Sequence, residues 1–229
     1  MKNTTPMIKS KYMSENTKTK IYQEIRRAVI MGTYKTGARL NVEEIAQHYQ
    51  TSVTPIRDAL QMLSQEGLVT IKPRAGYYIT RITLKELSDM FELRNLLELA
   101  AIERSIEKIN PEQILQLRSL HAGYTGDDDE SYDRYTEENR RFHYLLAKAS
   151  GNQELAHLVG HLMDRLARFM VLRHAGKTMQ ESHAKIIDAI EKRDLAAARE
   201  ALLDDIEGTR QTALDRIIQT EAATWHLEM

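Results

Sequence analysis

The apolar residues of this chain recur mostly at helical spacing, and the first such pattern covers Thr17–Met31. Ile21, Ile25 and Val29 form its apolar stripe, which predicts an amphipathic helix. The residues before this stripe, 1–17, are polar and show no periodicity. They predict a flexible N-terminal arm.

Two shorter helical patterns follow, Asn41–Tyr49 and Ser52–Leu63, and a tight turn separates them. Asn and Ser are preferred N-cap residues at such starting positions. Residues 33–40, ahead of both, predict a turn-rich connection. Behind them, Leu68–Lys72 and Tyr77–Arg81 are β-branched and aromatic runs around a turn that contains Pro and Gly, which predicts a hairpin. Two short helices followed by a hairpin predict a winged helix-turn-helix.

From residue 84 onward the pattern is entirely helical. The predicted fold is therefore mainly α: an N-terminal winged helix-turn-helix and a C-terminal all-α bundle of six to seven helices. We expect the first domain over residues 18–81, the second over 82–219 and a tail over 220–229. Short loops join the predicted helices of the bundle, which are Leu84–Glu107, Pro111–His121, Ser131–Ala149, Asn152–Arg173, Thr178–Lys192 and Asp194–Gln219.

Composition narrows the classes of protein to consider. The chain has 229 residues and no cysteine, which excludes disulfides and thiolate metal sites. It has no apolar run long enough to span a membrane, and its N-terminus lacks the apolar segment of a signal peptide. These features predict a cytoplasmic protein that does not associate with a membrane.

The charge is distributed unevenly along the chain. Residues 1–81 contain 13 Lys and Arg against 6 Asp and Glu, whereas residues 82–229 contain 19 against 27. A basic first domain favours nucleic acid as its partner, and an acidic second domain indicates a different task.

The second helix of a helix-turn-helix enters the major groove with its N-terminal side chains at the base edges. In this chain those side chains are Ser52, Val53, Thr54 and Arg57. Ser52 and Thr54 can donate to phosphates or bases, and Val53 can contact a thymine methyl group. Arg57 can bind a guanine with two hydrogen bonds or clamp a phosphate.

Three further residues are candidates for DNA contact. Arg74 lies at the predicted hairpin tip, where it can reach the minor groove or the backbone, and Gly76 permits the tight turn. Arg39 precedes the first of the two short helices and is a candidate phosphate contact. We therefore predict that double-stranded DNA is a partner of residues 18–81.

Histidine and carboxylate patterns give two candidate metal sites in the helical part. Asn139 and His143, four residues apart on one helical face, can combine with His183 and Asp205 from later helices. His157 and His161 form a second i,i+4 pair. Such pairs bind divalent metals but also arise often by chance, so each can equally be an ordinary surface or core-edge histidine.

Residues 18–81 resemble the winged-helix domain of GntR-type bacterial transcription regulators, and the helical remainder resembles the FCD effector domain of the FadR-like subgroup. One departure lies in the reading helix, because the family usually has arginine where this chain has Val53. The resemblance rests on Ile30–Gly32, Gly37–Leu40, Ser52–Leu60, Glu66–Val69, Pro73–Gly76, Glu92–Glu98, Phe142–Asn152 and His183–Ile190.

The resemblance implies a divalent metal inside the bundle, held in many members by an Asp four residues before a His and by two further His. The matching positions here are Asn139, His143, His183 and Asp205. This set can hold zinc, nickel or manganese, although Asn is a weak ligand. Because the resemblance places the metal at the other set, His157 and His161 are expected to be ordinary surface or core-edge histidines.

The resemblance also implies a small organic acid as effector. Arg94, within the apolar stripe of the first bundle helix, is a candidate for binding its carboxylate. The alternative for Arg94 is a structural ion pair with Glu98, four residues on. We predict a homodimeric, ligand-responsive regulator, in the first instance a repressor of a metabolic operon.

Two other functions stay open from the sequence. Two histidines and one carboxylate are also the ligand set of many metal-dependent enzymes, although no motif positions a general base here. The bundle can also serve dimerisation alone, with no effector.

Overall fold

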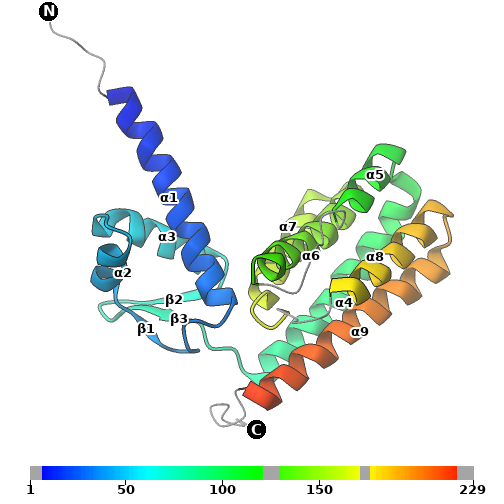
Figure 1. Cartoon of the computed structure of the whole chain (residues 1–229). Helices are drawn as coiled ribbons and strands as arrows, with labels where there is room; N and C mark the ends of the chain where they lie inside the picture. Colours follow the sequence, from blue (N-terminus) through cyan, green and yellow to red (C-terminus); the bar gives the residue numbers. More distant parts are fainter. Residues whose placement is uncertain (1–6, 121–128, 171–175, 221–229) are drawn as a thin grey trace, which may run out of the picture. The chain divides into compact units, whose positions relative to one another are not determined.

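The computed structural model describes residues 7–120, 129–170 and 176–220, and it divides into two compact units, residues 1–81 and 82–229 (Figure 1). Within the described residues, the first unit combines three helices with a small sheet, and the second contains helices and no strand. This is the predicted fold class. Most of the predicted tail and of the loop over 123–130 lies outside the described residues.

Helix α1 (Met7–Ile30) begins well before the predicted start at Thr17, so it includes residues that the sequence assigned to a flexible arm over 1–17. Those residues contain no Gly or Pro, and nothing in them stops a helix from extending towards the N-terminus. They also lack an apolar stripe, which is why periodicity did not reveal them. The C-terminal half buries Ile21, Ile25 and Val29, and α1 packs against α3.

Helices α2 (Val42–His48) and α3 (Val53–Gln65) have the predicted N-cap residues. The side chain of Asn41 accepts hydrogen bonds from the backbone N–H groups of Glu43 and Glu44. Ser52 has the extended backbone of an N-cap, but its hydroxyl makes no capping hydrogen bond. Helix α3 is held by its buried face, which consists of Ile56, Ala59, Leu60 and Leu63.

The sheet has three antiparallel strands in the order β1-β3-β2. Strands β2 (Val69–Lys72) and β3 (Gly76–Ile79) form the predicted hairpin, with Thr70 opposite Tyr78. Strand β1 (Arg39–Leu40) was missed, because two residues are too few to show alternation. It pairs with β3 and thereby attaches the connection after α1 to the hairpin.

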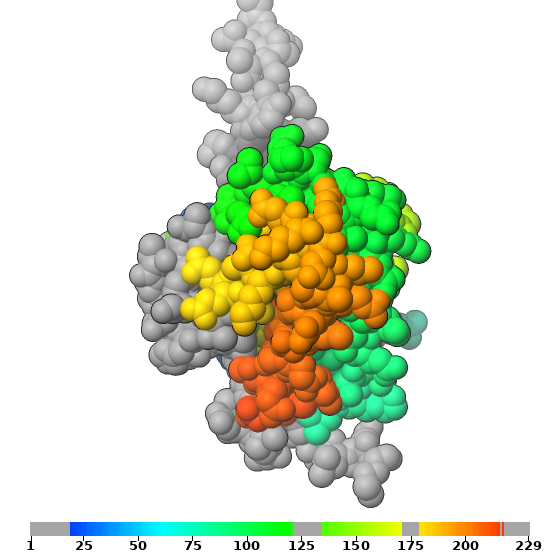
Figure 2. Space-filling model, turned by 90° about the vertical axis from the view of Figure 1, so that its right-hand side faces the viewer, coloured from blue at the N-terminus to red at the C-terminus, as the bar shows by residue number. Residues whose placement is uncertain are grey.

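The second unit is a bundle in which α4 contacts α6, α7 and α9, α6 packs on α7, and α8 packs on α9. Figure 2 shows α8 and α9 side by side on one face of the bundle. Among the described residues, none of the helices is long and apolar enough to cross a bilayer. The described part of this unit contains the helices α4 (Leu84–Lys108), α5 (Pro111–Ser119), α6 (Asp129–Ala149), α7 (Gln153–Leu166), α8 (Gly176–Glu191) and α9 (Leu195–Thr220).

Local sequence explains most of these boundaries. Capping boxes open α4 at Thr83 and α5 at Asn110, as expected for Thr and Asn three residues before Glu and Gln. Helix α7 ends at Leu166 rather than at the predicted Arg173, because the backbone tightens there. The N–H of Phe169 bonds to the carbonyl of Leu166, three residues back, instead of four.

Candidate functional site

The N-terminal end of α3 in the first unit exposes polar side chains to solvent. Ser52, Thr54 and Arg57 are exposed at the N-terminal end of α3, and Val53 is half-buried. The buried residues of α3 lie on its opposite face, so core packing holds the helix while these side chains face outward. The structure therefore presents the four residues predicted to read DNA at one helix terminus.

The three-stranded sheet and its turn carry the other three predicted residues. Arg74 is exposed in the turn with a φ of 59°, and Gly76 has a φ of 109°, which favours glycine. The Arg39 guanidinium lies beside Gly76, where a Cβ added to the glycine would be 3.5 Å from Arg39 Nε. This proximity follows from the β1–β3 pairing. Periodicity could not indicate this proximity, because the two residues lie in different predicted elements.

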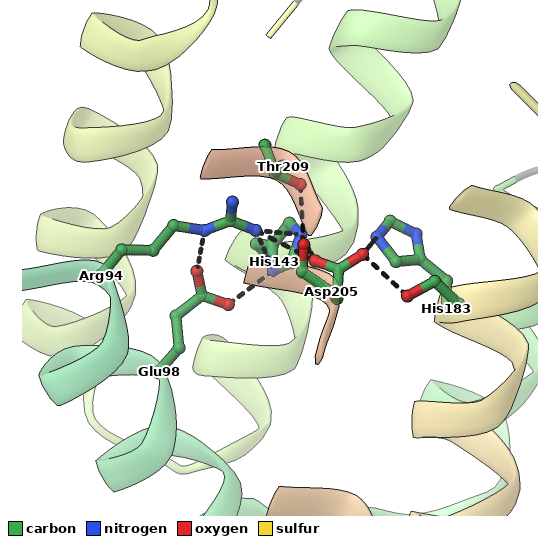
Figure 3. Close-up of polar contacts among 7 residues, drawn as sticks. Arg94, Glu98, His143, His183, Asp205 and Thr209 are labelled. Atoms are coloured by element: carbon green, nitrogen blue, oxygen red, sulfur yellow. Dashed lines mark hydrogen bonds and ion pairs between the residues drawn. The ribbon is translucent and has the colours of Figure 1, made fainter. Parts of the chain in front are cut away.

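The second unit encloses a buried polar centre, defined here as Arg94, Glu98, His143, His183 and Asp205 (Figure 3). The residues come from α4, α6, α8 and α9, and each is at most 6% exposed. Charged groups at this depth are costly unless they are paired and hydrogen-bonded. Their contacts therefore decide what the centre can do.

Arg94 joins the centre together through two of its nitrogens. Its Nε donates to Glu98 Oε1 at 2.7 Å, and its Nη2 lies 2.8 Å from His143 Nε2 and 3.2 Å from Asp205 Oδ2. The third nitrogen, Nη1, is buried and has no hydrogen-bond partner among the described residues. Arg94 thus forms the ion pair with Glu98 and also projects into the centre, so the two predicted roles are compatible.

The same contacts fix the tautomer of His143. A guanidinium nitrogen only donates, so His143 Nε2 must be the acceptor of the bond from Arg94. His143 Nδ1 lies 2.5 Å from Glu98 Oε2 and therefore carries the proton. Burial raises the pKa of Glu98, but the electrostatic interactions and hydrogen bonds of His143 and Arg94 outweigh it and lower the pKa to about 2. Glu98 is accordingly a carboxylate at neutral pH.

Asp205 forms the other side of the centre. Its Oδ1 accepts a 3.0 Å hydrogen bond from Ser182 Oγ and lies 3.7 Å from His183 Nε2, while its backbone carbonyl accepts from Thr209 Oγ1 at 2.8 Å. The His183 ring stacks on Phe142 with centroids 3.7 Å apart. Sequence reasoning missed Ser182 and Thr209. Ser182 adjoins His183, but no ligand spacing distinguishes either residue from other polar positions.

Two family models match the chain in tandem. The model described as "Bacterial regulatory proteins, gntR family" matches residues 17–79, and the FCD domain matches residues 89–208, which is over half of the 229 residues. The chain belongs to the gntR family and carries an FCD domain.

Individual relatives agree with this assignment. The transcriptional repressor RspR of Escherichia coli (strain K12) is 26% identical over 214 residues, covering 91% of this chain and 92% of that protein. The transcriptional regulator YdhC of Bacillus subtilis (strain 168) is 28% identical over 191 residues, with coverages of 80% and 84%. The solved structure of E. coli McbR/YncC has a TM-score of 0.70 at 18% identity and covers 87% of this chain and 98% of that chain, which shows a shared fold.

This gntR-family chain is therefore a DNA-binding transcriptional regulator with a helical effector domain, and it is not an enzyme. The alternative of a metal-dependent enzyme, which the histidine and carboxylate pattern left open, is wrong. Within the FCD domain, the same pattern marks a candidate metal site.

The donor geometry of the FCD domain fits a divalent metal. One ligand atom each from His143, His183 and Asp205 lie within 4.8 Å of one another. Metal bonds of about 2.1 Å place neighbouring donors roughly 3 to 4 Å apart, so a small closure suffices. Glu98 supplies the carboxylate that orients a metal-binding histidine through its other nitrogen.

Three other residues, Asn139, His157 and His161, were proposed from the sequence as metal ligands. Asn139 is buried on α6, one helical turn before His143. Its role as a ligand stays a prediction. His157 and His161 are exposed on α7, which agrees with the reading of this pair as ordinary surface histidines.

Proposed function

We propose that this regulator is a repressor whose FCD domain binds a divalent metal and a small organic acid, and that the acid weakens operator binding. The observation that carries the proposal is the buried centre. Arg94 Nη1 is an unpartnered buried donor beside a set of metal-ligating atoms. A donor buried without a partner costs on the order of 1–3 kcal/mol, so a ligand that accepts from it gains accordingly.

The metal site consists of His143, His183 and Asp205, with Asn139 as a possible fourth ligand through its amide oxygen. Zinc, nickel and manganese suit this mixture of imidazole and oxygen donors. The charges support a cation. With neutral imidazoles, the centre holds one guanidinium against two carboxylates, and a buried excess of negative charge is unfavourable.

The same count supports an acid as the effector. A divalent cation converts the excess of one negative charge into an excess of one positive charge. A single carboxylate then neutralises the centre, either on open metal positions or on Arg94. The chain's own contribution is to orient this anion through the donors of Arg94 and to keep water out of the bundle.

The DNA half of the proposal uses Ser52, Val53, Thr54 and Arg57 on bases and phosphates, with Arg39 on a phosphate and Arg74 at the hairpin tip on the backbone or minor groove. A homodimer presents two such helices to a pseudo-palindromic operator. Exposed Leu93 and Leu96 on α4 offer apolar surface for dimerisation. An acid that prefers one arrangement of the two reading helices shifts DNA affinity, and DNA reciprocally weakens acid binding.

The test begins with DNA fragments that the purified protein selects from a random library. Fluorescence anisotropy then measures their affinity for protein that is metal-depleted, metal-reloaded and exposed to a panel of small mono- and dicarboxylates. We expect one acid to weaken DNA binding only in the metal-loaded protein. If neither metal nor any acid changes the affinity, the bundle serves dimerisation alone and the effector proposal is wrong.

A further inference from the structure

The nitrogen of Arg94 that enters the centre contacts two of the three metal-ligating groups. Nη2 lies 2.8 Å from His143 Nε2 and 3.2 Å from Asp205 Oδ2. His143 Nε2 is also the ring nitrogen that a metal would bind, because His143 Nδ1 is occupied by Glu98, and Asp205 belongs to the candidate ligand group. The guanidinium and a metal therefore share His143 Nε2 and the Asp205 carboxylate as binding groups.

We infer that Arg94 is an intramolecular competitor of the metal, a resident cation that a divalent ion must displace from His143 and Asp205. This inference rests on the proposed metal site and concerns what controls its occupancy. The physical basis is the single lone pair on His143 Nε2. That lone pair either accepts a hydrogen bond from Nη2 or binds a metal, and it cannot do both.

Charge reinforces the competition. A guanidinium and a metal both carry positive charge and both stabilise the Asp205 carboxylate. The presence of one therefore weakens the binding of the other. The contact of Nη2 with two acceptors is charge-assisted, which makes it stronger than a neutral hydrogen bond. Metal binding must replace this stabilisation before it gains any affinity.

The structure also provides for the displaced state. Arg94 Nε is held at 2.7 Å by Glu98 Oε1, which is not among the candidate ligand atoms. The guanidinium can therefore turn about this anchor without leaving the bundle. Its Nη1 already lacks a partner among the described residues, so displacement of Nη2 leaves two buried donors in need of an anion. Metal occupancy thereby prepares Arg94 for an acidic ligand.

The experiment measures the affinity for Ni²⁺ alone by calorimetry in the full chain. Loss of a charge-assisted contact corresponds to about ten- to a hundredfold in affinity, so Arg94→Ala should bind Ni²⁺ tighter than wild type by that factor. Arg210→Ala is the matched control. This substitution also removes one positive charge, from the surface of α9, where Arg210 pairs with the exposed Glu207. The variant should therefore bind Ni²⁺ with unchanged affinity.

A chemical rescue separates direct competition from a general effect of charge. Guanidinium chloride at a non-denaturing concentration should weaken Ni²⁺ binding to Arg94→Ala back towards the wild-type value, and sodium chloride of equal ionic strength should not. The wild type should respond equally to the two salts. If both salts act alike on Arg94→Ala, or if this variant binds Ni²⁺ no tighter than wild type, the competition is refuted while the metal site stands.

Absence of Ni²⁺ binding in wild type and Arg94→Ala alike would remove the proposed metal site and the inference with it. Should Arg94→Ala fail to fold, two measurements replace it. Arg94→Lys keeps the charge but lacks the forked donors, so it should also bind Ni²⁺ tighter. In a crystal structure of Ni²⁺-loaded wild type, Arg94 Nη2 should have left His143 Nε2; retention of its contacts with both His143 and Asp205 would overturn the inference.

Discussion

Arg193 Nη2 donates a 2.9 Å hydrogen bond to the backbone carbonyl oxygen of Ile109, and Nη1 of the same side chain donates to the carbonyl of Ile106. These carbonyls belong to the C-terminal end of α4, where backbone acceptors lack intrahelical partners. The turn before α9 thus caps α4. This contact attaches the turn between α8 and α9 to the end of α4, and all three helices carry residues of the buried centre.

Replacing Arg193 with Ala should lower the free energy of unfolding of the bundle by about 1 kcal/mol, because two carbonyls lose a charged donor that is partly screened by solvent. Urea denaturation followed by circular dichroism measures the change. Arg210→Ala, which removes an exposed i,i+3 ion pair, should change it by less than about 0.5 kcal/mol. Equal effects of the two substitutions would show that the α4 cap contributes nothing.

Asn41 and Ser52 occupy equivalent N-cap positions, but substitution should affect stability at Asn41 and DNA binding at Ser52. Asn41→Ala should cost about 1 kcal/mol of stability, because Asn41 accepts from Glu43 and Glu44. Ser52→Ala should leave stability nearly unchanged, since its hydroxyl makes no capping hydrogen bond, and should weaken DNA binding instead. Denaturation and anisotropy on both variants check this, and a large stability loss in Ser52→Ala would contradict it.

Substitution of Arg74 should change DNA binding without lowering the stability of the fold. Its φ of 59° is strained for a residue with a side chain, so Arg74→Gly should unfold no more easily than wild type. The same substitution should weaken DNA binding for all sequences and reduce the slope of log affinity against log salt by about 1. A salt series by anisotropy decides the matter, and an unchanged slope would place Arg74 away from the phosphates.

Arg57 should behave differently from Arg74. If Arg57 contacts a guanine, Arg57→Ala costs about 1–3 kcal/mol on the preferred fragment and relaxes discrimination at one base position. Competition binding with single-base variants of that fragment measures the loss. A uniform weakening across all variants would reassign Arg57 to the backbone.

Glu98 should control the metal through His143. Glu98→Gln removes the carboxylate that accepts the hydrogen bond from His143 Nδ1–H and should weaken metal binding about ten- to a hundredfold. Elemental analysis and calorimetry report the change, with His157→Ala, an exposed histidine, as control. Unaltered metal affinity in Glu98→Gln would mean that His143 does not need this support.

Much of the fold was predictable because local sequence marks the element boundaries. The capping boxes at Thr83 and Asn110 and the Pro and Gly of the hairpin act through neighbouring residues alone. The spacing of apolar residues could not predict the early start of α1 or the two-residue strand β1, because neither segment has regularly spaced apolar residues. Strand β1 exists because a tertiary pairing with β3 holds it.

The centre was predictable only in part, for a related reason. His143, His183 and Asp205 come from separate helices, and the structure brings them together as the resemblance implied. Spacing along one helix could propose Arg94 and Glu98 as a pair, but it could not reveal that Arg94 also reaches His143 and Asp205 across the bundle. Such contacts depend on packing between helices.

The centre takes one or more residues from each of α4, α6, α8 and α9, and this gives the bundle a practical property. A molecule that binds there fastens four helices at once, so its binding free energy adds to the resistance of the whole bundle to heat. The melting temperature of the unmodified protein is then a direct assay for unknown metals and acids. Libraries of both can be ranked this way before any operator has been found.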